Sequence, residues 1–306
     1  IVLIKPVECF NIRVYKTANR QMEHDIQYPV KTIRCDKHNF SEMPVRIVAD
    51  PFLFTFNNRV YLFYEQQRLY HPGTIMMTCS ENLKEWTEPV TVLKEKCHLS
   101  FPFVFQDNGE VYMIPETSAL GEIRLYRAAD DGLKKFVYIK SIDVPCADDG
   151  KVNFADTCIL KERDIYYLFT STENSNEYQQ HLYYADCLEG PYHKHPCSPI
   201  VRGNKVGRNG GSILLIDDML VRVAQDCVRG YGENIHLLKI DELTKETYAE
   251  HIIKEKLLPT ADGFYQNGGH QFNMVDFNGM TIISTDAKEY NYYFAEKILH
   301  KIGILR

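Results

Sequence analysis

Hydrophobic and polar positions alternate in short runs along the chain, and long stretches with the 3.6-residue period of a helix are few. Five segments share one pattern, in which an apolar strand is followed by a polar turn and a second aromatic or aliphatic strand. They cover residues 51–65, 102–116, 157–171, 211–225 and 270–285. Alternation interrupted by turn residues predicts five β-hairpins.

The hairpins recur at a nearly constant spacing. Their starts lie 51 to 59 residues apart, which is in the range of β-propeller blades. Tight turns are predicted at Asn57-Asn58, Asp107-Asn108-Gly109, Asp217-Asp218 and Asn278-Gly279. A sandwich or barrel also has short strands, but it does not repeat one hairpin unit at this spacing. We therefore predict an all-β chain that forms a single five-bladed β-propeller domain over 1–306, in which 1–45 supply a closing strand and an extension.

Composition excludes several classes of protein. The 306 residues are 44% hydrophobic and 25% charged, as in an ordinary globular protein with a real core. The net charge of −6 is spread along the chain, so we expect no nucleic-acid partner. No apolar run approaches the roughly 18 residues that a membrane span needs. The opening IVLI is too short for a signal-peptide core, although Ile1 is not an initiator Met, which leaves a lost leader open.

Nine cysteines are scattered through the chain without a C-x-x-C pair. Free thiols used as small core residues are typical of a reducing compartment, so we expect a cytoplasmic protein. Histidines such as His193 and His195 have no shared ligand spacing. We therefore expect neither a metal ion nor another cofactor.

Two carboxylates precede equivalent hairpins. Asp50 and Asp156 follow an alanine and directly precede the first and third repeats. In a propeller the innermost strands begin at one mouth of a central channel, so these side chains would face each other. Paired carboxylates around a cavity are what glycosidic chemistry requires. The alternative is that each aspartate caps a turn with its side chain.

Two glutamates end equivalent strands. Glu116 ends the second hairpin and Glu65 ends the first. A glutamate at a strand end is usually a solvated rim residue. We include Glu116 with Asp50 and Asp156 as a candidate catalytic residue and leave Glu65 out.

Other polar residues near the predicted mouth are candidates for substrate binding: His98, Arg208, Asn209, Gln225, Asp226, Tyr231 and His270. Arg208 lies beside glycines and could hold a carboxylate, phosphate or sulfate in two hydrogen bonds. A structural pair with a neighbouring aspartate is an equal alternative for Arg208. His270 could bond a sugar, but a single histidine is more often structural.

Several motifs resemble one known family. They lie at 49–52, 98–105, 112–116, 124–128, 195–201, 207–208, 210–211, 225–227, 231–232 and 269–270. Because these motifs occur in this order over roughly residues 45–290, the chain resembles the N-terminal domain of plant glucosamine inositolphosphorylceramide transferase and its bacterial stand-alone relatives. That family is similar in fold to the five-bladed glycoside hydrolases of families 43, 32 and 68.

The resemblance to the hydrolases implies roles for two residues. Asp50 matches their catalytic aspartate, which is the base in inverting members and the nucleophile in retaining ones. Asp156 matches the aspartate that tunes the acid or stabilises the transition state. Their general acid is a glutamate in the fourth blade, where this chain has Arg208. Either Glu116 replaces that acid or hydrolysis of the usual kind does not occur.

Two functions remain. The first is a glycoside hydrolase-like or glycosyltransferase-type enzyme that acts on a glycan or activated sugar in surface-polysaccharide or glycolipid metabolism. The second is a non-catalytic glycan-binding or accessory domain of a glycosyltransferase system. Either function predicts a carbohydrate or sugar-phosphate ligand, and a glycosyltransferase is the expected partner.

Overall fold

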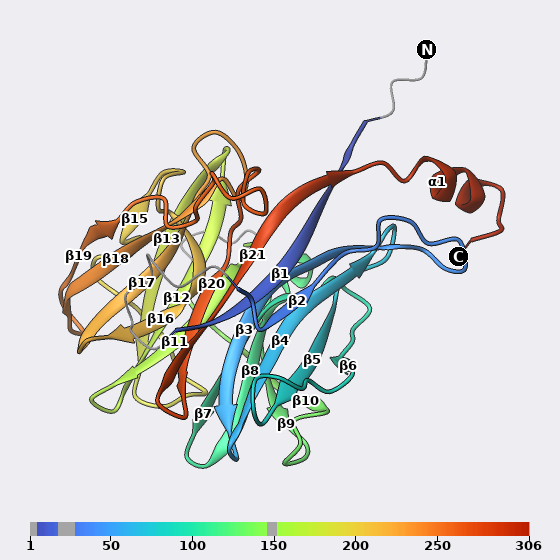
Figure 1. Ribbon diagram of the computed structural model, residues 1–306. Helices are drawn as coiled ribbons and strands as arrows, with labels where there is room; N and C mark the ends of the chain where they lie inside the picture. The colour runs from blue at the N-terminus through green and yellow to red at the C-terminus, as the bar shows by residue number, and fades with distance from the viewer. Residues whose placement is uncertain (1–4, 18–27, 146–151, 306) are drawn as a thin grey trace.

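The computed structural model describes residues 5–17, 28–145 and 152–305, and these residues form mainly β-strands (Figure 1). The largest sheet has the strand order β20 (Phe272–Phe277), β21 (Met280–Asn291), β1 (Val7–Thr17), β3 (Val45–Phe56), β4 (Arg59–Arg68), β5 (Thr74–Ser80) and β6 (Val90–Leu93), with β2 (Lys31–Ile33) beside β1. The all-β prediction is therefore confirmed.

Three smaller sheets complete the described strands. One has the order β10 (Phe136–Ile142), β9 (Ile123–Ala128), β8 (Glu110–Glu116) and β7 (Ser100–Asp107). The next holds β11 (Ala155–Glu162), β12 (Ile165–Asn174), β13 (Glu177–Ala185) and β14 (His193–Lys194), with β15 (Val201–Arg202) beside β13. The last holds β16 (Arg208–Ile216), β17 (Met219–Asp226), β18 (Asn234–Leu243) and β19 (Tyr248–Lys254).

Five hairpins occupy the positions that the repeat predicts: β3–β4, β7–β8, β11–β12, β16–β17 and β20–β21. Each is joined by a two-residue turn in which both residues have positive φ, as the right-handed twist of the strands favours. The four turns expected from the sequence are confirmed. The fifth turn, Arg163-Asp164, is not among the four expected ones because arginine is not a residue that favours such turns.

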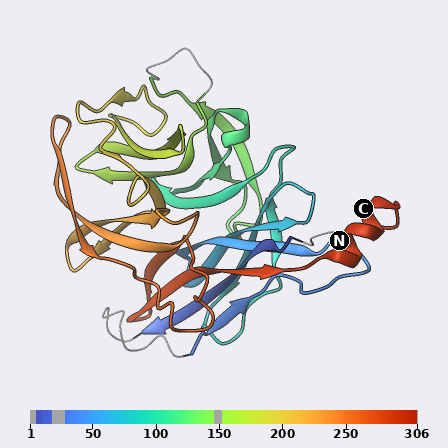
Figure 2. The ribbon, with the colours of Figure 1, turned by 90° about the horizontal axis from the view of Figure 1, so that it is seen from above.

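The first strands of the hairpins pack against one another in chain order. β3 contacts β7, β7 contacts β11, β11 contacts β16, β16 contacts β20, and β20 contacts β3. Seen from above, the hairpins follow one another around the molecule (Figure 2). Aromatic side chains fill the space between neighbours, as where Phe52 packs edge-on against Phe101 with ring centroids 4.8 Å apart.

The N-terminal strand joins the last hairpin to the first. β1 pairs antiparallel with β21 along its whole length and touches β3 through one parallel bridge. At the far end of this sheet the short helix α1 (Phe294–Lys301) projects from the other elements (Figures 1 and 2). Within the described ranges, no helix is long and apolar enough to cross a membrane.

The pairing of β1 yields a test of the fold. Ile12 is fully buried on β1, opposite Asp286 of β21 and Ile33 of β2. We expect Ile12→Ala to lower the free energy of unfolding by about 2–5 kcal/mol, because a buried cavity replaces the side chain. Urea unfolding measures the change, and Lys16→Ala, exposed on the same strand, is the control. Equal effects of the two substitutions would contradict the buried position of β1.

Candidate active site

Three residues at the starts of hairpins share a backbone conformation that is uncommon outside glycine. Asp50, Phe101 and Asp156 have φ angles of 51°, 43° and 51°. At each of them the strand pairing shifts register, which is the mark of a β-bulge. A bulge re-aims its side chain and interrupts the ladder of backbone hydrogen bonds. The three bulges therefore give Asp50 and Asp156 equivalent places in their hairpins.

Polar side chains of the adjacent hairpin accept the N–H groups that the bulges expose. The four bonds run from Asp50 N to Asp286 Oδ2 (3.1 Å), from Phe101 N to Asp50 Oδ2 (2.9 Å), from Asp156 N to Glu116 Oε2 (3.3 Å), and from Asn209 N to Ser171 Oγ (2.9 Å). Each bond crosses from one hairpin to the next. The same contacts hold the hairpins together and gather carboxylates at one end of them.

A polar cavity of about 240 Å³ lies at this end. Six of the residues singled out in the sequence line it: Asp50, His98, Glu116, Arg208, Tyr231 and His270. Phe10 and Arg46, which no sequence pattern marks, line it as well, and so does Glu65, the strand-end glutamate left out of the candidate set. A cavity of this size with acidic, basic and aromatic walls can hold one sugar-sized ligand.

His270 lies between two carboxylates. Its Nε2 is 3.2 Å from Asp50 Oδ1 and its Nδ1 is 2.8 Å from Asp286 Oδ2, and all three residues are buried. Burial alone would lower the pKa of His270, but the two carboxylates raise it to about 9. Burial raises the pKa of Asp50 to about 6, although His270 acts in the opposite direction. At neutral pH the site therefore holds an imidazolium between two carboxylates.

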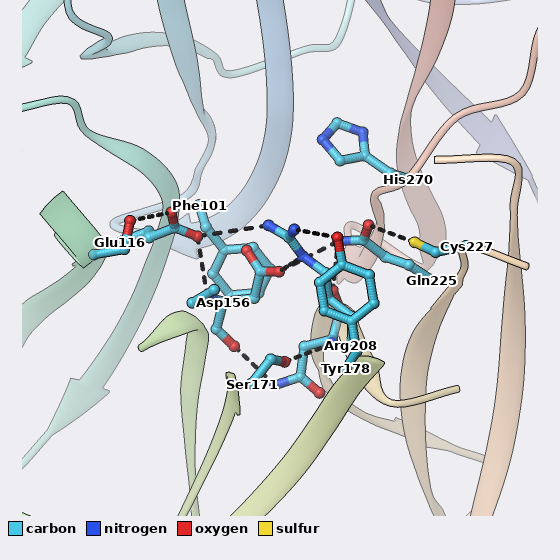
Figure 3. Close-up of polar contacts among 12 residues, drawn as sticks. Phe101, Glu116, Asp156, Ser171, Tyr178, Arg208, Gln225, Cys227 and His270 are labelled. Carbon is cyan, nitrogen blue, oxygen red and sulfur yellow. Dashed lines mark hydrogen bonds and ion pairs between the residues drawn. The ribbon is translucent and has the colours of Figure 1, made fainter. Parts of the chain in front are cut away.

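Arg208 pairs with the second aspartate. Its Nε donates to Asp156 Oδ2 at 2.5 Å, and its Nη2 is 3.8 Å from Glu116 Oε2 (Figure 3). The guanidinium also lies 5.3 Å and 4.9 Å from the ring centroids of Tyr178 and Tyr231. Burial raises the pKa of Asp156, and Arg208 opposes that shift. The positive charge of Arg208 is thus compensated by the chain's own acids, which favours its structural interpretation over an anion clamp.

A second cavity of about 410 Å³ adjoins the first. Glu116 and Arg208 line both cavities, so their side chains form the wall between them. Tyr178, Thr172 and Asn176 are among the residues on its far side. Its lining is polar and presents hydroxyl and amide groups of the kind that bond sugars.

Asp50, His270 and Asp286 are also the group of described residues with the geometry to hold a metal ion. Their ligand atoms lie within 4.8 Å of one another. Both imidazole nitrogens, however, already face a carboxylate. A metal would have to displace the imidazolium from one of these contacts, because a histidine ligand must offer an unprotonated nitrogen. The contacts present are those of an ion-paired triad.

Three of the predicted binding residues lie outside the cavity lining. Asn209 Nδ2 donates to the backbone oxygen of Asp156 at 2.8 Å, and Gln225 Nε2 donates to Asn209 O at 2.7 Å and to Asp156 Oδ2 at 3.3 Å. Both amides are buried supports of Asp156. Asp226 lies 3.3 Å from His236 and accepts the N–H of Val228, so its contacts stabilise the end of its own hairpin.

Two acids of the site were missed in the sequence. Glu65 lines the cavity opposite Ala49, as Glu116 lies opposite Ser100 in the next hairpin. The repetition of a strand-end glutamate in the first two hairpins is the sequence signal that indicates Glu65. Asp286 sits inside a strand, next to Thr285 in an ordinary alternating run, and no local signal marks it.

Comparisons with known proteins agree with this architecture. The family described as "Glucosamine inositolphosphorylceramide transferase 1, N-terminal" matches residues 2–283. Glucosamine inositolphosphorylceramide transferase 1 of Arabidopsis thaliana is 33% identical over 251 residues, which cover 79% of this chain and 32% of that protein. The protein of the same name from Oryza sativa subsp. japonica is 34% identical over 245 residues, or 78% of this chain and 32% of its own. The chain thus spans about a third of the length of these relatives.

Solved structures of similar fold are glycoside hydrolases. The family 117 enzyme Zg3597 of Zobellia galactanivorans has a TM-score of 0.56 at 16% identity, with 83% of this chain and 87% of that one covered. The α-L-arabinofuranosidase PaAbf62A of Podospora anserina has a TM-score of 0.57 at 9% identity, with 82% and 92% covered. At such identities the likeness concerns the fold, which is that of β-propeller-like glycoside hydrolases.

The triad predicts a pH dependence of stability. Because the pKa of His270 rises from 6.5 to about 9 on folding, the stabilisation by its charge is present at pH 6.5 and is lost as pH rises through 9. We expect the stability difference between the wild type and His270→Gln to shrink by about 3 kcal/mol between pH 6.5 and 9.5. Urea unfolding across this range measures it, and exposed His71→Gln is the control. A difference independent of pH would contradict the imidazolium.

The Arg208–Asp156 pair predicts a rescue. Arg208→Met leaves a buried aspartate without its cation and should cost about 3–5 kcal/mol of stability. Adding Asp156→Asn removes the unpaired charge and should restore most of the loss. Thermal and urea unfolding measure both variants, and Arg163→Met, at an exposed arginine, should change little. An additive loss in the double variant would show that the pair does not act as a unit.

Proposed function

Because the chain belongs to the family of the N-terminal region of glucosamine inositolphosphorylceramide transferase 1, we propose that it acts on a glycan or an activated sugar. Its place would be in surface-polysaccharide or glycolipid metabolism. The observation that carries the proposal is the convergence of Asp50, Asp156 and Glu116 on one end of the hairpins, where Asp50 and Glu116 line the same cavity. A binding pocket for sugar does not by itself need buried acids from separate hairpins, whereas glycosidic chemistry does.

The same proposal includes five blades. The five hairpins would be the inner halves of blades, with β1 completing the last of them beside β21. The contacts of the first strands, which return from β20 to β3, support this arrangement. A shared axis would explain why the bulges present their side chains to a common cavity.

Asp50 and Asp156 would have different tasks. Asp50, which lines the cavity, would be the base or nucleophile, and its pKa of about 6 leaves it ionised at neutral pH. Asp156, fixed by Arg208 and Gln225, would set the electrostatic field of the site. Glu116 would orient Asp156 through the backbone bond and face the sugar from the wall between the cavities.

The second candidate is a glycan-binding domain without catalysis. What favours it is Arg208, which stands at the fourth hairpin, where the resemblance to the hydrolases calls for a general acid, and which already pairs with Asp156. The relatives are about two and a half times as long as this chain, so their named transferase activity could reside elsewhere in them. In that case this domain would hold the sugar for a glycosyltransferase.

A cytoplasmic location remains part of the proposal. All eight cysteines of the described residues are free thiols, which supports a reducing compartment.

Asp50→Asn separates the two candidates. For an enzyme, we expect turnover to fall by about 10²–10⁴-fold, because the amide cannot accept a proton, while binding of the same sugar changes little. Activity of the wild type should rise with pH through about 6 as Asp50 ionises. The measurements are turnover of a panel of 4-nitrophenyl glycosides and binding on a glycan array. Asp131→Asn, at an exposed site, is the control. Sugar binding with no turnover by the wild type would favour the binding domain.

A further inference from the structure

Glu65 is a buried acid of the cavity to which the proposed function assigns no task. It lies on β4 directly opposite Ala49, the residue before Asp50, and its side chain is 6% exposed. It lines the cavity together with Asp50, Glu116 and His270. Its Oε1 is buried and makes no hydrogen bond. A carboxylate in that position would lack the donors that stabilise its charge.

The surroundings of Glu65 are mostly acidic. Burial raises its pKa well above the ordinary value, and Asp50, Glu116 and Asp286 raise it further. Arg46 is the cation that acts in the opposite direction, and its guanidinium is bonded to Gln67 Oε1 and Glu8 O. Burial and the neighbouring acids therefore both favour the protonated form of Glu65.

His98 lies beside the carboxyl group. The backbone N–H of Gly73 donates to His98 Nδ1 at 2.9 Å, so the neutral ring carries its proton on Nε2. That nitrogen lies 3.3 Å from Glu65 Oε1. Burial and Arg46 lower the pKa of His98, which favours the neutral ring. The uncharged ring therefore adds no cation beside the carboxyl group of Glu65.

Gly73 is required for this arrangement. A Cβ at position 73 would lie 2.4 Å from Leu99 O, 2.9 Å from Glu65 Oε1 and 2.9 Å from the His98 ring. Only glycine brings its backbone N–H this close to His98. Three residues from separate segments thus place one carboxyl group beside the candidate base.

We propose that Glu65, which lies beside His98 and the candidate base, is the proton donor of this cavity. The inference rests on the proposed function. It fills the role of general acid, which the fourth hairpin does not supply because Arg208 stands there. Asp50 and Glu65 would then divide the work of base and acid, as two carboxyl groups in different environments do in other glycosidic sites.

The proton transfers balance as follows. Glu65 gives its proton to the oxygen that leaves the anomeric carbon, and that carbon–oxygen bond breaks. An oxygen of water or of an acceptor hydroxyl forms the new bond and loses its proton to Asp50. Asp50 then releases a proton to solvent and Glu65 takes one up, so both side chains return to their starting states.

Infrared spectroscopy of the ligand-free chain tests the stored proton. At pH 8, above the pKa of Asp50, we expect the wild type to show the C=O band of a protonated carboxyl group. Glu65→Gln, which resembles the neutral acid in shape, should fold normally and lose that band. Glu88→Gln, at an exposed glutamate, should keep it. An unchanged band in Glu65→Gln would overturn the proposal.

Leaving-group dependence tests the donor role. On a glycoside that the wild type hydrolyses, Glu65→Gln should lower kcat/KM by about 10²-fold or more for the phenyl derivative. It should have little effect on the 2,4-dinitrophenyl derivative, whose leaving group needs no proton. The variant should also lose the basic limb of the pH profile, whereas His98→Gln should shift that limb and keep it. Equal losses on both derivatives would overturn the proposal.

Different results would contradict the proposed function and the donor role of Glu65. If the wild type hydrolyses none of the glycosides, the proposed function is wrong and the donor role falls with it, while the infrared band still decides whether Glu65 holds a proton. If the wild type is active and Glu65→Gln is indifferent to the leaving group, the donor is another residue and the proposed function stands.

Discussion

The site depends on one backbone constraint, which is the need of each bulge N–H for a partner. A bulge removes that N–H from the hydrogen-bond ladder, and a buried donor left unpaired is costly. In this chain the partner is a polar side chain of the adjacent hairpin, as when Asp50 accepts from Phe101 N and Glu116 accepts from Asp156 N. The left-handed conformation at each bulge costs about 1–2 kcal/mol, which such bonds offset. Carboxylates that accept the bulge N–H groups are therefore also the ones that could take part in catalysis.

Gathering acids in this way creates an electrostatic problem that the cavity solves with three devices. His270 places an imidazolium between Asp50 and Asp286, and Arg208 pairs with Asp156. Glu65 has no cation at hydrogen-bond distance, and its burial among other acids favours its protonated form. Side chains of one chemical type thus favour different protonation states because each has different neighbours. That division is the property a pair of acid and base requires.

The sequence predicted the repeating parts of this structure better than the parts that depend on contacts between repeats. Hairpins and most turns follow from local alternation and from asparagine, aspartate and glycine, and the equivalent positions of Asp50 and Asp156 follow from the period. The pairing of Arg208 with Asp156 bridges 52 residues of sequence, and no local pattern indicates it. Asn209 and Gln225 are polar residues within or next to motifs, as binding residues would be, yet their buried amides donate hydrogen bonds to Asp156. No local pattern indicates that Glu65 is buried, because the segment that contains Gly73 and His98 covers it.

The pairing of Arg208 with Asp156 bears on which residues of the cavity could take part in catalysis. An acid at that place would add a further negative charge beside Asp156 and Glu116, whereas the guanidinium lies 2.5 Å from the first and 3.8 Å from the second. With this pair in place, Asp156 is bound to Arg208 and lies outside the cavity lining, which leaves the side of Asp50 as the place for the proposed reaction. Glu65 lies on that side, one strand away from Asp50 and within the same cavity. A proton donor in the first hairpin would therefore reconcile the proposed catalysis with an arginine in the fourth.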